Sequence, residues 1–155
     1  MNRYLLDTNI LLGLTRMAPW AKEVVERYRL SDPDTLVFTT IVCRGEILAL
    51  AEKFGWGDRR RETLTRVLND FPTVGIEKDS VVTTYAKLSA WSEGKTVMDP
   101  EFPEPPKPAK KIGQNDIWIA AVARVSQAIL ITTDKDFDAL SDGVIQRIWV
   151  NQDSK

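Results

Sequence analysis

Hydrophobic positions along the chain follow two alternating patterns: short β-rich runs, and longer stretches in which apolar side chains recur every three or four residues. The short runs predict strands that end at Leu6 and cover residues 36–39, 74–76, 128–132 and 144–150. The longer stretches predict helices that begin near Ile10 and Pro19 and helices over 41–54, 58–68, 79–91, 113–127 and 134–140. Because strands alternate with helices, the pattern predicts an α/β fold whose mainly parallel sheet is covered on both faces.

The segment from residue 94 to residue 113 departs from both patterns. It contains five prolines, Pro100, Pro103, Pro105, Pro106 and Pro108. Proline donates no backbone hydrogen bond and continues neither a helix nor a central strand. We expect a long exposed loop at about 94–113 inside a single domain that spans residues 1–155, a length that suits one hydrophobic core.

The composition is that of an ordinary globular protein and narrows the possible chemistry. Hydrophobic residues make up 43% and charged residues 28%, and the absence of histidine excludes histidine-based triads and histidine zinc sites. The single cysteine, Cys43, cannot form an intramolecular disulfide, and the longest apolar run, Ile117–Ala123, is too short to span a membrane. We therefore expect a cytoplasmic protein without a membrane segment. Since the net charge is -1, nucleic acid would have to meet a local basic patch.

Two acidic residues directly follow predicted strands. Asp7 comes after the opening strand, and Asp134 comes after the strand at 128–132. Ligand sites of parallel sheets form beyond the carboxyl ends of the strands, so these carboxylates converge if their strands are neighbours. An acid at such a position is also a common helix cap, and that interpretation stays open.

Two further acids lie on predicted helices. Glu46 shares the apolar side of its helix with Leu50, which directs a charge toward the core. Asp116 lies in the first turn of its helix, one turn before Ala120, and Asn115 is a candidate cap. Taken alone, Glu46 is also compatible with an ion-paired residue at the core boundary, and Asp116 with a partner of the helix dipole.

Four carboxylates gathered at one site would repel one another unless a cation neutralises them. Ligation by oxygen alone selects Mg²⁺ or Mn²⁺ over Zn²⁺. A carboxylate-held ion of this kind can activate water for attack on phosphorus and stabilise the leaving oxygen. The predicted chemistry is therefore phosphodiester hydrolysis.

Four parts of the chain carry a resemblance to a known family. They are Leu-Leu-Asp-Thr-Asn-Ile-Leu at 5–11, Glu46 in the helix after the second strand, Gly-Gln-Asn-Asp-Ile-Trp-Ile-Ala-Ala at 113–121, and Thr-Thr-Asp-Lys-Asp-Phe at 132–137. In this order they resemble the PIN-domain nucleases, and among these the VapC-type toxins of toxin-antitoxin pairs. The resemblance covers nearly the whole chain.

The resemblance implies a three-layer α/β/α sandwich and an endoribonuclease that depends on Mg²⁺ or Mn²⁺. It also implies a homodimer that a cognate antitoxin holds inactive. By position, three acids would bind the metal: Asp7, Asp116 and Asp134. Glu46 would hold the attacking water or a second ion.

The resemblance also assigns supporting residues. Thr8, Asn9 and Thr132 would orient the acids through hydroxyl and amide groups. Asp136 or Asp138 could take the role of Asp134, which we prefer because it is the first acid beyond its strand.

The proline-rich segment departs from the family, because it is longer than the connection that usually precedes the Asn-Asp motif. Two interpretations of its lysines, Lys107, Lys110 and Lys111, stay open. They bind RNA phosphates or an antitoxin, or they are solvated charges of a loop. We expect the five tryptophans in the core or at a dimer surface rather than as base-stacking platforms.

Two other functions are compatible with the sequence. Phospho-aspartate enzymes also place acids on an α/β fold, but the segment from Asp7 to Asn9 lacks the second acid, two residues on, of the phosphatase type. A catalytically degenerate domain that binds RNA or a protein partner would need no metal and would cleave nothing.

Overall fold

The structure, a computed structural model, describes residues 2–140 and 143–153. Within these residues, five strands form a parallel sheet with the order β3-β2-β1-β4-β5. The strands are β1 (Arg3–Leu6), β2 (Leu36–Thr40), β3 (Thr73–Val74), β4 (Ile129–Thr132) and β5 (Gln146–Trp149). The helices are α1 (Thr8–Thr15), α2 (Pro19–Arg27), α3 (Ile41–Lys53), α4 (Asp58–Asp70), α5 (Asp79–Ser92), α6 (Gln114–Ser126) and the 3-10 helix η1 (Lys135–Leu140).

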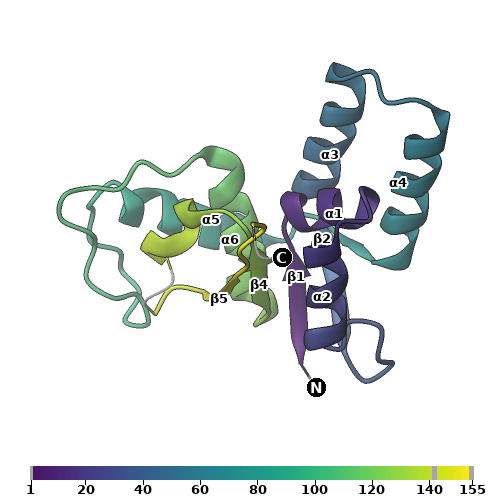
Figure 1. Ribbon diagram of the computed structural model, residues 1–155. Helices are drawn as coiled ribbons and strands as arrows, with labels where there is room; N and C mark the ends of the chain where they lie inside the picture. The colour runs from purple at the N-terminus through teal and green to yellow at the C-terminus, as the bar shows by residue number, and fades with distance from the viewer. Residues whose placement is uncertain (1, 141–142, 154–155) are drawn as a thin grey trace.

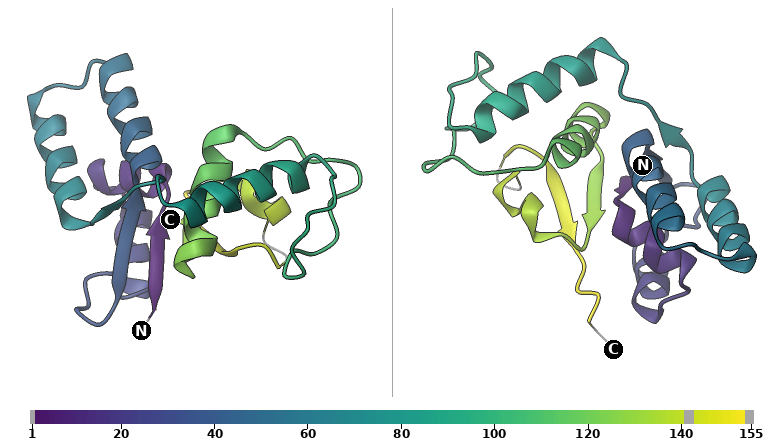
Figure 2. Two further views of the ribbon diagram at one scale, coloured as in Figure 1. Left: turned by 180° about the vertical axis from the view of Figure 1, so that it is seen from behind. Right: turned by 90° about the horizontal axis from the view of Figure 1, so that it is seen from above.

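Helices lie on both sides of this sheet. Figure 1 shows α1, α2, α3 and α4 grouped beside β1 and β2, whereas α5 and α6 lie on the other side, with α6 next to β4. The two views of Figure 2 show the same separation. The predicted α/β/α arrangement around a parallel sheet is confirmed.

The central pair of strands brings distant parts of the chain together. Leu6 of β1 pairs with Ile131 of β4, and the backbone N–H of Asp7 donates to the carbonyl of Ile131 at 3.1 Å. Because the two strands run in the same direction, the residues that follow them meet at one edge of the sheet. The condition under which Asp7 and Asp134 converge is therefore met.

Burial on both faces explains why the central strands are apolar throughout. Leu5, Leu6, Leu130 and Ile131 are inaccessible to solvent, as is typical of parallel strands between two helix layers. Burying each such side chain contributes about 2 kcal/mol. The helix α6 is buried from residue 119 to residue 123 and packs against β4, so its first turn is held firmly beside the carboxyl end of the sheet.

Residues 93–113 connect α5 to α6 without a helix or strand. The indole N–H of Trp91 donates to the carbonyl of Pro103 at 2.9 Å, and the guanidinium of Arg124 lies 4.4 Å from the ring centre of Phe102. At the end of the connection, the backbone N–H of Lys110 donates to the carbonyl of Ser92 at 2.8 Å. These contacts attach the proline-rich segment to α5 and α6 at three points.

Several element boundaries differ from the predicted ones: β3 covers Thr73–Val74 instead of 74–76, and β5 covers Gln146–Trp149 instead of 144–150. Two further differences have a local physical reason. The helix predicted at 134–140 is the 3-10 helix η1, because the carboxylate of Asp134 accepts the backbone N–H of Asp136 at 2.8 Å and shapes the first turn. The predicted cap Asn115 is wrong, since α6 begins at Gln114 with Gly113 as its N-cap. Among the described residues, no helix has both the length and the apolar character that a membrane crossing requires.

Candidate metal centre

A pocket of about 720 Å³ opens at the carboxyl ends of β1 and β4. Its polar lining comes from four separate parts of the chain: Asp7, Thr8, Asn9, Glu46, Lys53, Asn115, Asp116 and Asp134. Its apolar lining comes from α3, α6 and the segment after β3: Ile41, Val42, Ala49, Leu50, Ile76 and Trp118. We call this the acidic pocket, and it contains all four acids that the sequence singled out.

Asp7 lies at the base of the acidic pocket and is 5% exposed. One carboxylate oxygen accepts the backbone N–H of Thr8 at 2.8 Å and so caps α1, and the other accepts the hydroxyl of Thr132 at 2.6 Å. Burial raises the pKa of Asp7 from 3.8 to about 6, against the effect of these two hydrogen bonds. Asp7 is thus a helix cap and also a member of the acidic cluster.

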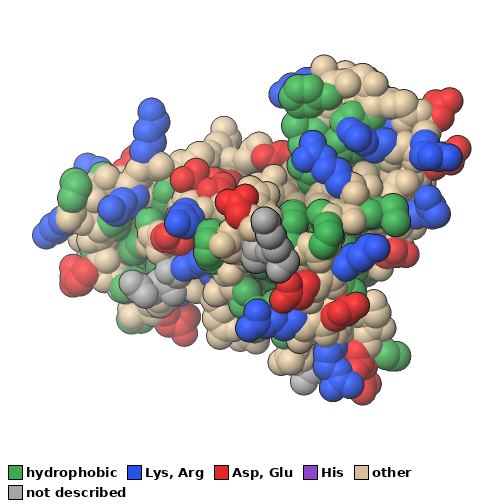
Figure 3. All heavy atoms as spheres, viewed as in Figure 1, with side chains coloured by type: hydrophobic (Ala, Val, Ile, Leu, Met, Phe, Trp, Pro, Cys, Tyr) green, Lys and Arg blue, Asp and Glu red, His purple; other side chains and the backbone are tan. Residues whose placement is uncertain are grey.

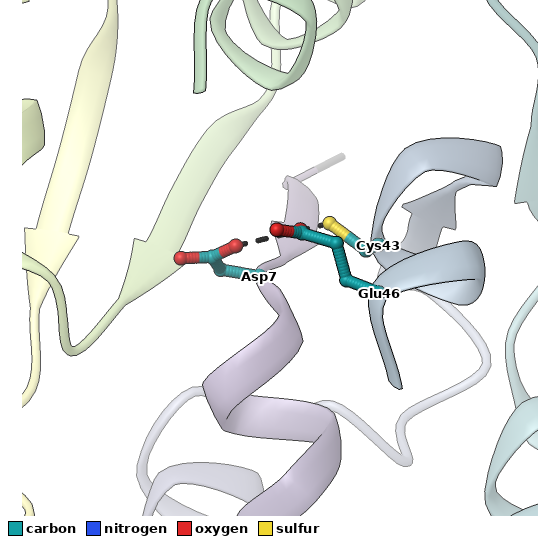
Figure 4. Close-up of side chains that lie close together, drawn as sticks. All are labelled: Asp7, Cys43 and Glu46. Atoms are coloured by element: carbon teal, nitrogen blue, oxygen red, sulfur yellow. Dashed lines mark hydrogen bonds between the residues drawn. The ribbon is translucent and has the colours of Figure 1, made fainter. Parts of the chain in front are cut away.

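Glu46 extends from α3 toward Asp7 (Figure 4). The hydroxyl of Thr40 caps α3 by accepting the backbone N–H of Cys43 at 3.0 Å, which places Glu46 one turn later above Asp7. Glu46 is half-buried, and the hydroxyl of Thr8 donates to its carboxylate at 2.7 Å. The amide of Asn115 adds a long hydrogen bond of 3.5 Å to the same carboxylate.

Cys43 lies beside the acids, although the sequence did not assign it to the site. Its thiol lies 3.8 Å from a carboxylate oxygen of Asp7, as the dashed line in Figure 4 marks, and it is inaccessible to solvent. Burial and the nearby carboxylate raise the pKa of Cys43 to about 12. The thiol therefore stays protonated at neutral pH and donates to Asp7.

Asp116, Asp134 and Asp136 form the opposite side of the cluster. Each offers a carboxylate oxygen within 4.8 Å of those of the other two. Burial, followed by the negative charges of Asp7, Asp134, Glu46 and Asp136 in that order, raises the pKa of Asp116 from 3.8 to about 7. The negative charge of each other acid in the cluster therefore disfavours ionisation of Asp116.

The two alternatives to Asp134 have different surroundings. Asp136 joins Asp116 and Asp134, whereas the carboxylate of Asp138 forms an ion pair with Arg147 of β5 at 3.2 Å. Asp134 itself is held by the hydroxyl of Thr132, which accepts its backbone N–H at 3.0 Å. A single threonine thus connects Asp7 to Asp134.

Basic side chains flank the acids. Lys53 lines the acidic pocket on α3, and a neighbouring groove contains Lys110, Lys111 and Lys135 together with Asp136. Lys107 lies further along the connection and is exposed. Figure 3 shows acidic side chains gathered near the middle of the molecule and basic side chains on either side.

The donor set suits a hard cation. Among the residues that the structure describes, none of the five acids Asp7, Glu46, Asp116, Asp134 and Asp136 forms an ion pair. Carboxylates this close together are stabilised when a cation lies among them. Oxygen ligands supplied by several segments are the environment that Mg²⁺ and Mn²⁺ take in proteins.

The fold and the site together define an α/β protein with a carboxylate pocket beyond the carboxyl ends of its parallel strands, which can hold a divalent metal ion. The family model of the PIN domain matches residues 4–143. This chain belongs to the PIN-domain family, as the resemblance predicted. No curated protein matches the sequence significantly.

Solved structures share the fold at low sequence identity. VapBC2 from Rickettsia felis, bound to a DNA fragment from its promoter, aligns with a TM-score of 0.76 and 17% identity over 96% of this chain and 99% of that chain. VapBC-1 from nontypeable Haemophilus influenzae aligns with a TM-score of 0.67 and 23% identity over 95% and 97%. VapBC-5 from Mycobacterium tuberculosis, a member of a toxin-antitoxin family, aligns with a TM-score of 0.57 and 24% identity over 97% and 100%.

Proposed function

We propose that this protein is a metal-dependent endoribonuclease that acts in the cytoplasm as the toxin of a toxin-antitoxin pair. The observation that carries the proposal is the acidic pocket, where the carboxylates of Asp7, Glu46, Asp116 and Asp134 come from four separate segments and, within the described residues, form no ion pair. Membership of the PIN-domain family supports a nuclease. The likeness to VapBC structures supports the toxin role.

In this proposal, Asp7, Asp116 and Asp134 bind Mg²⁺ or Mn²⁺, and Asp136 adds charge next to the last two. When bound, such an ion lowers the pKa of water and stabilises charge on a leaving oxygen. Glu46 orients and deprotonates the attacking water, since its carboxylate borders the pocket and carries no ion pair within the part of the chain described.

Two threonine hydroxyls hold these acids in place. Thr8 donates to Glu46 and Thr132 donates to Asp7, and Asn9 lines the same pocket. Each hydrogen bond to a carboxylate contributes about 1.5 to 3 kcal/mol and restricts the rotamer of the acid. The chain therefore preorganises the oxygen ligands before any ion or substrate arrives.

The proposal is tested by replacing Asp7 with Asn and Asp116 with Asn together. We expect RNA cleavage in Mg²⁺ or Mn²⁺ to fall by more than about 100-fold, because the oxygen ligands lose two charges. Gel analysis of a structured cellular RNA pool measures cleavage, and circular dichroism checks that the fold is retained. The matched control is Asp138→Asn, whose carboxylate pairs with Arg147, and we expect it to keep its activity.

Undiminished Mg²⁺-dependent cleavage by the Asp7→Asn, Asp116→Asn variant would show that the acidic pocket is not the catalytic site. RNA binding by the unmodified protein without cleavage in any divalent ion would instead favour a degenerate RNA-binding domain. A phospho-aspartate role for Asp7 is disfavoured because Asp7 is 5% exposed and both its oxygens accept hydrogen bonds.

The proposed partners are an antitoxin and a second copy of the chain. An antitoxin arginine inserted among the carboxylates would neutralise them and compete with the metal. If a small DNA-binding protein is encoded beside this chain, we expect it to copurify with the chain and to abolish cleavage. Light scattering of the purified chain tests the homodimer, and a monomer mass would contradict it.

A further inference from the structure

Trp118 occupies a different environment from the tryptophans of the core. Trp56 and Trp91 are 7% and 4% exposed, as the sequence predicted for this residue type. Trp118 is half-buried on α6, two residues after Asp116, and lines the acidic pocket. Trp118 therefore packs against the core, as expected of this residue type, and in addition borders the acidic pocket.

The indole of Trp118 is held rigidly. Tyr85 of α5 stacks on it with the ring centres 3.8 Å apart and an angle of 19° between the planes. Ala49, Leu50 and Ile76 border the same pocket, so that Trp118 and these side chains form an apolar wall beside the acids. Tyr85 does not line the pocket and supports the wall from behind.

Charge on both sides of the pocket complements a polyanion. Lys53 lies at the α3 margin, and Lys110, Lys111 and Lys135 line the adjoining groove that shares Asp136. The net charge of the chain is -1, so attraction to phosphates arises from these local groups. A strand that crosses the acids would meet lysines before and after them.

We propose that the wall formed by Trp118, Ala49, Leu50 and Ile76 binds a nucleobase of single-stranded RNA whose neighbouring phosphate lies at the acids. This inference rests on the proposed ribonuclease function and adds the side chains that hold the substrate base beside the acids. An aromatic platform stacks any base that is free to leave its neighbours, whereas bases in a duplex are stacked and paired already. A volume of about 720 Å³ accommodates a nucleotide-sized ligand. Trp118 is a positioning residue in this role.

The test measures binding apart from cleavage, in the Asp7→Asn, Asp116→Asn background. Fluorescence anisotropy follows a short labelled oligoadenylate, the same strand in a duplex with oligouridylate, and an oligomer of equal length with abasic riboses. We expect Trp118→Leu to weaken oligoadenylate binding about 10-fold, because one stacked base is lost. Trp118→Phe keeps an aromatic face and should keep most of the affinity. Binding to the abasic oligomer should be the same with Trp118 and with Leu at this position.

The matched control is Trp20→Leu, a half-buried tryptophan of α2 outside the acidic pocket, which should leave all three affinities unchanged. Equal oligoadenylate affinity for Trp118 and Trp118→Leu, or equal binding of the single strand and the duplex, would overturn the inference. If the catalytically active protein cleaves RNA with the same KM before and after Trp118→Leu, the proposed function stands and the base site is excluded. A Trp118-dependent affinity in a protein that never cleaves RNA would support the base site and remove the nuclease.

Discussion

At the scale of single residues, one side chain can serve folding and the candidate site together. Asp7 caps α1 through the backbone N–H of Thr8, which accounts for an acid at the end of a strand without any ligand. Its second oxygen accepts from Thr132, and its charge acts on Asp116. The cap interpretation of Asp7 is therefore confirmed, and the same side chain also lines the acidic pocket, where its role in binding a metal stays a prediction.

The raised pKa values of Asp7 and Asp116 predict that the metal-free protein loses stability as the pH rises. Their ordinary pKa is 3.8, and in the folded chain the values are about 6 and about 7. Below about pH 4 both acids are protonated in the folded and unfolded states, so burial costs little. Between about pH 4 and pH 7 the unfolded chain releases protons that the folded chain retains, and the free energy of unfolding falls.

Thermal melts in a chelator, at a series of pH values, measure this effect against Asp116→Asn. We expect the wild type to lose about 1 to 2 kcal/mol relative to this variant between about pH 4 and pH 7.5, allowing for solvent screening at the partly exposed Asp116. Mg²⁺ should restore the lost stability of the wild type at neutral pH and have little effect on its stability near pH 4. Parallel pH profiles for the two proteins would contradict the prediction.

At the scale of helices and strands, close packing rather than charge decides where the elements lie. A methyl group built on Gly13 of α1 would lie 2.5 Å from the indole of Trp20 on α2, which shows how closely these helices approach. Gly45 of α3 has no heavy atom within 4 Å of the same position. Both glycines lie within a helix, but they differ in what surrounds them.

This difference predicts opposite effects of the same substitution. Gly13→Ala should lower the free energy of unfolding by about 1 to 3 kcal/mol, because the indole or the helix has to move. Gly45→Ala should raise it by about 0.5 to 1 kcal/mol, since alanine favours a helix and meets no obstacle. Urea denaturation measures both changes, and a stabilising Gly13→Ala would show that α1 and α2 are packed less closely than described.

At the scale of the whole molecule, the strand order is the decisive feature. Placing β4 beside β1 joins the first residues of the chain to residues more than a hundred positions later. Lysines from α3, the long connection and η1 then surround acids from β1, α3, α6 and the end of β4. A chain of net charge -1 thereby presents a local charge pattern that suits a nucleic acid and a cation.

This charge pattern predicts how nucleic-acid binding depends on salt. Lys110→Ala and Lys111→Ala should each reduce the slope of log affinity against log salt by about 0.7 if each lysine contacts one phosphate of a single strand. Anisotropy titrations of oligoadenylate over a series of salt concentrations, in the Asp7→Asn, Asp116→Asn background, provide the slopes. Lys22→Ala, on the exposed side of α2, should not change the slope. If only Lys22→Ala reduced the slope of log affinity against log salt, the phosphate contacts would lie on α2 and not at Lys110 and Lys111.

Much of the local structure was predictable because it depends on neighbouring residues. The strand predicted at 36–39 is Leu36–Thr40, and the helix predicted at 41–54 is Ile41–Lys53. Asn115 was misassigned as a cap because a capping pattern does not say which residue faces the helix end, and its amide contacts Glu46 instead. Asp136 and Asp138 look alike in sequence, and the structure distinguishes them because Asp136 lies near Asp116 and Asp134 whereas Asp138 pairs with Arg147 of β5.

The sequence by itself determined the alternation of strands and helices, the parallel sheet and the four acids around which the site is built. Hydrophobic spacing and helix caps act over a few residues, so these features can be inferred from the printed order of residues. The tertiary structure decided which acids face one another, that Cys43 donates to Asp7, and that Tyr85 supports Trp118 beside the pocket. Those contacts depend on strand order and helix packing, which join residues from distant parts of the chain and leave no local signal in the sequence.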